Sequence, residues 1–111
     1  MSPTLEKVVT VNNPMGIHMR PADLLSRTAG RFECQVLIEN NGQAIDCKSI
    51  MSILTLGARQ GTQLHLRVTG ADAQQAMDAL CELFEQGFDE SDSEGSYRTV
   101  KLNEDATDSL F

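Results

Sequence analysis

One pair of side chains in this sequence is suited to phosphate chemistry. His18 and Arg20 lie in the segment Gly16-Ile17-His18-Met19-Arg20-Pro21-Ala22. An amphipathic segment follows directly, so we expect a helix to begin there with His18 at its N-cap. The first amides of a helix lack intrahelical acceptors and lie at the positive end of the helix dipole. The segment therefore predicts an anion site made by backbone amides and the Arg20 guanidinium.

The same surroundings make His18 a candidate nucleophile. Positive charge nearby disfavours the imidazolium form and leaves one ring nitrogen able to attack phosphorus. A phosphoryl group on that nitrogen would be a dianion, which Arg20 and the helix amides would stabilise by charge-assisted hydrogen bonds. Gly16 allows the loop to approach other backbone closely or to adopt a positive φ. The simpler alternative is that His18 only caps a helix and that Arg20 is a solvated charge.

A second candidate site begins at Ser49. Lys48 to Leu54 is expected to form a short helix with Ser49 as its N-cap, where a phosphate on the hydroxyl would be tolerated. Because so short a helix cannot bury every face, Ile50, Met51 and Leu54 are expected to form an exposed apolar patch suited to protein docking. A plain helix cap is the alternative for Ser49.

Hydrophobic periodicity predicts the elements that position these residues. Alternating patterns indicate strands at 5–11, 33–38, 43–47 and 62–69. Helical patterns cover 19–29, 48–54 and the segment from Ala73 to Phe84. The order β-α-β-β-α-β-α predicts an α+β sandwich with helices on one face of a sheet and the other face open.

Turn and cap residues delimit these elements. Asn40-Asn41-Gly42 is expected to close a hairpin, because both central residues tolerate positive φ. Gly30 is expected to end the first helix and Gly87 the last. Asp72 is expected to cap the last helix, with Gln75 at the capping-box position.

Composition narrows the class of protein. The chain has 111 residues, of which 41% are hydrophobic, and has no apolar run of the roughly 18 residues that a membrane span needs. No secretory signal is visible, so we expect a cytoplasmic protein. Its net charge of −7 argues against nucleic-acid binding. Cys34, Cys47 and Cys81 lack the spacing of a zinc site and are expected to be buried or half-buried thiols.

The negative charge is concentrated at the C-terminal end. Residues 89–111 hold seven acidic and two basic side chains, a net charge of −5, which leaves −2 for residues 1–88. We therefore expect one domain over 1–88 and a solvated, flexible acidic tail over 89–111. Tyr97 to Leu102 alternates within the tail and is either a short added strand or a partner-binding segment. His65 is expected to be a solvated surface residue.

The segment 16–22 resembles the active-site signature of the histidine-containing phosphocarrier protein (HPr) family of the bacterial phosphoenolpyruvate:sugar phosphotransferase system. The segment Lys48-Ser49-Ile50-Met51-Ser52-Ile53-Leu54-Thr55-Leu56-Gly57-Ala58-Arg59-Gln60-Gly61 resembles that family's regulatory-serine segment. The resemblance covers residues 5–88 and implies an open-faced sandwich of four antiparallel strands and three helices.

The resemblance also implies roles for particular residues. His18 matches the histidine phosphorylated on Nδ1, Arg20 the arginine that contacts the phosphoryl group, and Ser49 the serine that an ATP-dependent kinase modifies. Further positions match the partner-docking surface: Met19, Ile50, Met51, Leu54 and Thr55. Asp23 departs from the family, whose members commonly carry a small residue at that position of the docking face.

The function implied is that of a phosphoryl carrier. Enzyme I would be the donor, EIIA-type proteins the acceptors, and an HPr serine kinase/phosphorylase a regulator, with a monomeric carrier that needs no metal or organic cofactor. One alternative is a regulatory member of the same family that docks to enzymes or transcription factors without serving sugar transport. Another is a plain protein-binding module.

Overall fold

The computed structural model describes residues 3–89. Its elements follow the predicted order: β1 (Thr4–Thr10), α1 (Met19–Gly30), β2 (Gln35–Asn40), β3 (Gln43–Asp46), α2 (Ile50–Leu54), β4 (Gln63–Thr69), α3 (Ala73–Glu85) and a final 3-10 turn, η1 (Gly87–Asp89). The predicted strand and helix ends are correct to within one or two residues. The predicted acidic tail and the alternating segment Tyr97 to Leu102 lie outside the described residues, apart from Asp89.

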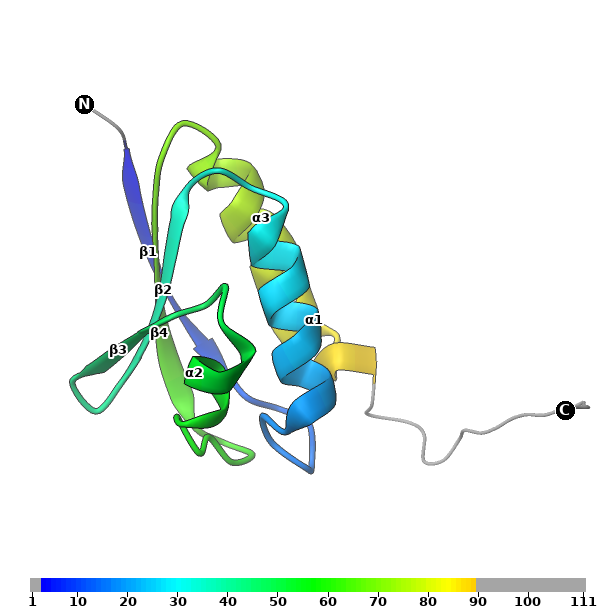
Figure 1. The fold of residues 1–111 in the computed structure, drawn as a ribbon. Coiled ribbons are helices and arrows are strands. Elements are labelled where there is room, and N and C mark those ends of the chain that lie inside the picture. Colours follow the sequence, from blue (N-terminus) through cyan, green and yellow to red (C-terminus); the bar gives the residue numbers. More distant parts are fainter. Residues whose placement is uncertain (1–2, 90–111) are drawn as a thin grey trace, which may run out of the picture.

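The four strands form one antiparallel sheet in the order β1-β4-β2-β3. Figure 1 shows the helices gathered on one side of this sheet, with the opposite side uncovered. The predicted open-faced α+β sandwich is confirmed. None of the helices in residues 3–89 has the length and apolar character of a membrane-spanning segment.

Strand alternation decides which side chains enter the core. On β4, Leu64, Leu66 and Val68 are buried, whereas Gln63 and His65 between them are exposed. Burying each such apolar side chain contributes about 1.5–3 kcal/mol. The largest fully buried side chains come from both layers: Phe88, Leu25, Ile38, Ile53, Leu64, Leu66 and Leu80.

The hairpin between β2 and β3 has the predicted turn. Asn41 has φ 54° and Gly42 has φ 82°, the two consecutive positive values of a type I′ turn. Asn40 pairs with Gln43 directly before and after it. The local signal Asn-Gly was sufficient to predict the turn, and the structure adds the register of the two strands.

Gly30 does not cap α1 as predicted, and Asp72 occupies the predicted N-cap position of α3 without a capping bond from its side chain. Gly30 is the last residue of α1, and the C-cap is Arg31 in the right-handed helical region, so no left-handed glycine ends this helix. Asp72 is the N-cap residue of α3, but its side chain does not cap the helix. Its carboxylate instead accepts hydrogen bonds from the amides of Glu33 (2.9 Å) and Cys34 (3.1 Å), which fixes the start of β2.

The end of α3 was predicted only in part. Gly87 follows the C-cap Gln86 and has φ 61°, as expected of a glycine that ends a helix. The chain then continues in the left-handed region through Phe88 (φ 57°) and Asp89 (φ 61°). This η1 turn inserts the Phe88 ring into the core, where it lies 5.0 Å from the Phe84 ring in an edge-to-face contact.

Candidate functional site

His18 is the N-cap residue of α1, as predicted. Its backbone is extended (φ −101°, ψ −164°), and its carbonyl accepts the first helical bond from the Ala22 amide at 3.0 Å. The imidazole does not cap its own helix and is half-buried. The side chain is therefore held at the positive end of α1 without serving as the helix cap.

A tight turn before His18 fixes the direction in which the chain enters α1. The Gly16 amide donates to the Asn13 carbonyl at 3.1 Å, and the Asn13 side chain donates back to the Gly16 carbonyl at 2.8 Å. Asn13 is fully buried. This structural role of Asn13 was not predicted from the sequence.

Gly16 is required where the turn meets the loop after α2. Its φ is 70°, and a Cβ there would lie 2.5 Å from the Ala58 carbonyl oxygen and 3.0 Å from the Arg59 Cα. The Ile17 amide donates to that same Ala58 oxygen at 2.9 Å. The predicted close approach at Gly16 is confirmed, and it joins the His18 loop to the segment that follows α2.

Arg20 lies in the first turn of α1 and is exposed. Its Nη1 donates a 2.8 Å hydrogen bond to the Phe88 carbonyl in η1. A guanidinium carries five N–H donors in a planar fork, and the bond to the main chain helps to orient this group at the start of α1. No sequence signal pointed to Phe88 as a partner, because 68 positions separate the two residues.

Ser49 is the N-cap of α2, as predicted. Its Oγ accepts a hydrogen bond from the Ser52 amide at 3.2 Å, and its carbonyl accepts from Ile53 at 3.0 Å. Figure 1 shows α2 alongside the N-terminal part of α1, and the two helices contact each other. The His18 and Ser49 segments thus belong to the same helical layer.

The predicted docking residues differ in exposure. Met19 and Met51 are 58% and 71% exposed, and Thr55 is also exposed. Ile50 and Leu54 are partly buried because they pack against the core, so the apolar patch predicted on α2 is narrower than expected. A further exposed methionine, Met15 at 72%, lies in the loop before His18 and was not predicted.

Asp23 lies one turn after Met19 on α1. Its carboxylate is 3.0 Å from Nε of Arg27, one turn further along the same helix. Both side chains are substantially exposed, so this pair contributes little to stability. Arg27 does, however, offset part of the negative charge that Asp23 brings to the helix surface.

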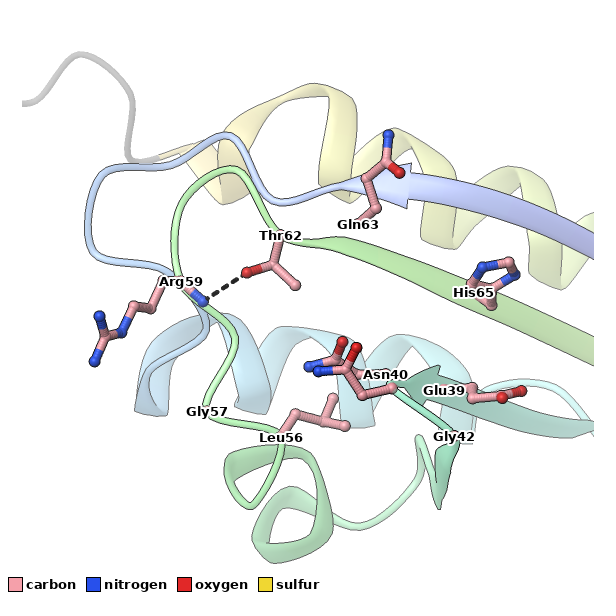
Figure 2. A pocket seen from close by; sticks show the side chains of 10 residues that line it. Glu39, Asn40, Gly42, Leu56, Gly57, Arg59, Thr62, Gln63 and His65 are labelled. Carbon is pink, nitrogen blue, oxygen red and sulfur yellow. Dashed lines mark hydrogen bonds between the residues drawn. The ribbon is translucent and has the colours of Figure 1, made fainter.

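His65 is exposed on the open face of the sheet, as predicted. It lines a polar cavity of about 750 Å³ with residues of the β2–β3 hairpin and of the loop before β4. Figure 2 shows this cavity and the hydrogen bond from the Arg59 amide to Thr62 Oγ1 (3.1 Å) beside it. The lining residues include neither His18 nor Ser49, so the candidate site lies outside this cavity.

The three cysteines are buried and unbonded to one another, as predicted. Burial raises the pKa of the Cys47 thiol to about 12, and Asp46 adds to this effect. Within residues 3–89, no three His, Cys, Asp or Glu side chains are grouped as a metal site would need.

Comparison with known proteins identifies a family. Residues 5–86 match the family described as "PTS HPr component phosphorylation site". The chain is 40% identical over 86 residues to the phosphocarrier protein HPr of Xylella fastidiosa (strain Temecula1), covering 78% of this chain and 97% of that protein. It is 41% identical over 91 residues to that of Pseudomonas aeruginosa PAO1, covering 81% and 99%.

A similar solved structure is that of HPr-C-His from Thermoanaerobacter tengcongensis. It superimposes with a TM-score of 0.74 at 36% sequence identity, covering 77% of this chain and 96% of that one. The family match ends at residue 86, so η1 and the residues after it lie beyond the matched segment.

Proposed function

Because this chain belongs to the HPr family of phosphocarrier proteins of the phosphotransferase system, we propose that His18 accepts and donates a phosphoryl group. The observation that carries the proposal is the position of the imidazole at the N-terminus of α1, where it does not cap the helix. This position argues against the alternative in which His18 serves only as a cap.

The transfer needs positioning and charge stabilisation and little else. Nδ1 of His18 attacks the phosphorus of a phosphohistidine on the donor, in line with the bond that breaks. A P–N bond forms on His18 as the P–N bond of the donor breaks, and the donor imidazole leaves with the electron pair of that bond. Arg20 and the first amides of α1 stabilise the equatorial phosphoryl oxygens by charge-assisted hydrogen bonds.

The donor in this proposal is enzyme I, and the acceptors are EIIA-type proteins. The exposed Met19 and Met51 supply adaptable apolar contacts suited to several partners in turn. A small, exposed contact area suits complexes that must separate after each transfer. A cytoplasmic location and a monomeric state stay predictions, as does the division into a domain over 1–88 and a tail over 89–111.

The two histidines of the chain allow a matched test. The protein is incubated with phosphoenolpyruvate and purified enzyme I, and intact mass is recorded before and after acid treatment. We expect one acid-labile phosphoryl group in the wild type and in His65→Ala, and none in His18→Ala. Equal labelling of His18→Ala and His65→Ala would refute the assignment.

We also propose that Ser49 is a regulatory phosphorylation site. A phosphate adds about two negative charges at pH 7, and at Ser49 these would lie on α2 beside the exposed Met51. The charge would oppose docking of an apolar or acidic partner surface. Incubation with ATP and an HPr serine kinase should give an acid-stable phosphate in the wild type and in Ser52→Ala, but none in Ser49→Ala.

The regulatory alternative differs in its acceptors. A carrier passes the phosphoryl group from His18 to an EIIA-type protein, whereas a docking regulator does not. Phosphorylated protein mixed with purified EIIA-type proteins should therefore lose its phosphoryl group within minutes, with the mass of one acceptor rising. Retention of the phosphoryl group with every acceptor tried would favour the docking regulator.

A further inference from the structure

We propose that the polar cavity beside the β2–β3 hairpin binds a small, neutral, polyhydroxylated molecule of the saccharide class. Its volume of about 750 Å³ is within the range of cavities that hold small ligands. Its lining includes neither His18 nor Ser49, so the proposal does not depend on the proposed carrier function.

The cavity lies between two parts of the chain that are distant in sequence. One side is the end of β2 with the hairpin turn, from Glu39 to Gly42, and the other comes from the loop after α2 and the start of β4, between Leu56 and His65. Glu39 pairs with His65 in the register of β2 and β4, so the sheet holds the two sides together. Each of these strands is paired on both edges, which leaves neither of them an edge for an extended peptide.

The lining presents hydrogen-bond donors and acceptors in the mixture that hydroxyl groups require. Asn40, Asn41 and Gln63 carry amides, each with a donating NH₂ and an accepting oxygen. His65 adds an imidazole. Within residues 3–89, none of these four side chains forms a hydrogen bond with another protein group. Since a hydroxyl both donates and accepts, neighbouring hydroxyls of a polyol can bond to both atoms of one amide.

The charges around the cavity disfavour an ionic ligand. Oε1 of Glu39 lies 3.4 Å from Nη2 of Arg67, and Nε of Arg67 lies 3.5 Å from a carboxylate oxygen of Glu6. The Glu39 carboxylate repels an anion, and Arg67 beside it repels a cation. Arg59 also lines the cavity, but Figure 2 shows its guanidinium pointing away from the other labelled side chains. A carboxylate has about four acceptor sites, so Glu39 can still accept from a ligand hydroxyl.

The lining also has room and an apolar contact for a sugar ring. Leu56 is 8% exposed and lies among the polar lining groups, where it can meet the C–H face of a ring. Gly42 and Gly57 line the cavity without side chains, and a Cβ at either position would have no atom within 4 Å. The lining residues include no Phe, Tyr or Trp on which a ring could stack. We therefore expect weak binding, with a dissociation constant in the low millimolar range.

The first test is a titration of the ¹⁵N-labelled full chain with glucose and with maltose, followed by ¹H–¹⁵N spectra. We expect saturable shifts of the side-chain NH₂ signals of Asn40, Asn41 and Gln63, and of backbone amides within 39–42 and 56–65. The absence of a saturable shift with either sugar up to about 50 mM, well above a low-millimolar dissociation constant, would overturn the proposal. Shifts spread evenly over the whole protein would do the same.

Two glutamines provide a matched control. Gln63 and Gln35 are both exposed, and they are the first residues of β4 and β2, but Gln63 lines the cavity and Gln35 does not. Gln63→Ala should weaken sugar binding about three- to tenfold, as expected for the loss of one or two hydrogen bonds, whereas Gln35→Ala should stay within about twofold of the wild type. Both variants should unfold at the temperature of the wild type, because exposed side chains contribute little to stability. Equal weakening by both variants would contradict a site at the cavity.

The last test concerns the charge of the ligand. Glucuronate has the ring of glucose and carries a carboxylate in place of the hydroxymethyl group. At low salt, we expect glucuronate to bind at least about threefold more weakly than glucose, and this difference to disappear in Glu39→Gln. Equal or tighter binding of glucuronate by the wild type would overturn the assignment of a neutral ligand. These titrations involve no phosphoryl transfer, so their failure and a failure of the carrier function are distinguishable.

Discussion

The Ile17 amide donates a 2.9 Å hydrogen bond to the Ala58 carbonyl, and thereby joins the loop before α1 to the loop after α2. These two loops belong to the two segments in which the sequence predicted chemistry. A shift of the Ala58 loop would therefore move the His18 backbone with it. This relationship makes the site sensitive to substitution of Gly16, the glycine beside Ile17.

Gly16→Ala should destabilise the protein and slow phosphorylation of His18. The new Cβ would lie 2.5 Å from the Ala58 oxygen at a residue with φ 70°, so both a clash and backbone strain result. We expect a loss of about 2–4 kcal/mol in the free energy of unfolding, measured by urea denaturation. Gly57→Ala is the control, because Gly57 has φ 58° but no atoms within 4 Å of its added Cβ. It should lose only about 1 kcal/mol, and equal losses would contradict the role assigned to the Ala58 contact.

The Asp72 carboxylate should account for part of the stability that the protein loses on acidification. The hydrogen bond from the Glu33 amide, with further bonds from Cys34, lowers the pKa of the Asp72 carboxyl below its ordinary value of 3.8. The unfolded chain then binds a proton at Asp72 more readily than the native protein does. The contribution of the Asp72 carboxylate to the free energy of unfolding is therefore fully present above pH 3.8 and is lost as the pH falls through the native pKa.

Urea denaturation of the wild type and Asp72→Asn from pH 7 to pH 2.5 tests this effect. Asp72→Asn should be less stable at pH 7 and should lose less stability on acidification than the wild type. Asp78→Asn is the control, because the Asp78 carboxylate bonds to Gln74 on the exposed side of α3. Parallel curves for the wild type and Asp72→Asn would show that the carboxylate does not hold the start of β2.

The Cys47 thiol should be unreactive in the native protein. With a pKa of about 12, its thiolate fraction at pH 8 is on the order of one in ten thousand. The side chain is also fully buried, with Sγ 3.9 Å from the Leu25 carbonyl oxygen. Iodoacetamide labelling followed by peptide mass analysis should leave Cys47 unmodified over hours, and urea-unfolded protein should react at all three cysteines. Rapid native labelling of Cys47 would contradict its burial against α1.

The Ser49 hydroxyl should contribute to stability through its cap. Ser49→Ala removes the acceptor for the Ser52 amide and should cost about 1 kcal/mol of unfolding free energy. Ser49→Asp retains a capping oxygen and should keep most of that stability. If Ser49→Asp nevertheless slows phosphorylation of His18 by enzyme I, the slower rate is due to the added negative charge and not to a loss of stability. A thermal-unfolding midpoint for Ser49→Asp no higher than for Ser49→Ala would contradict the capping role.

The sequence by itself determined the element order, the hairpin turn and the positions of His18 and Ser49 at helix N-caps. Each of these depends on neighbours within a few positions: strand alternation, helical periodicity, or the positive φ that Asn41 and Gly42 tolerate. The family resemblance could be drawn from the same local segments.

Only the tertiary structure decided which distant groups meet. Asp72 occupies the expected N-cap, yet its carboxylate bonds to amides 38 and 39 positions away because β2 begins beside α3. The Asn13 turn, the contact of Gly16 with Ala58, and the bond from Arg20 to Phe88 likewise depend on packing. Periodicity specifies which face of an element is apolar, but not which backbone carbonyl a neighbouring element presents to a polar side chain. The contact of Arg20 with the Phe88 carbonyl therefore depends on the packing of α1 against the η1 turn and could not be predicted from the sequence.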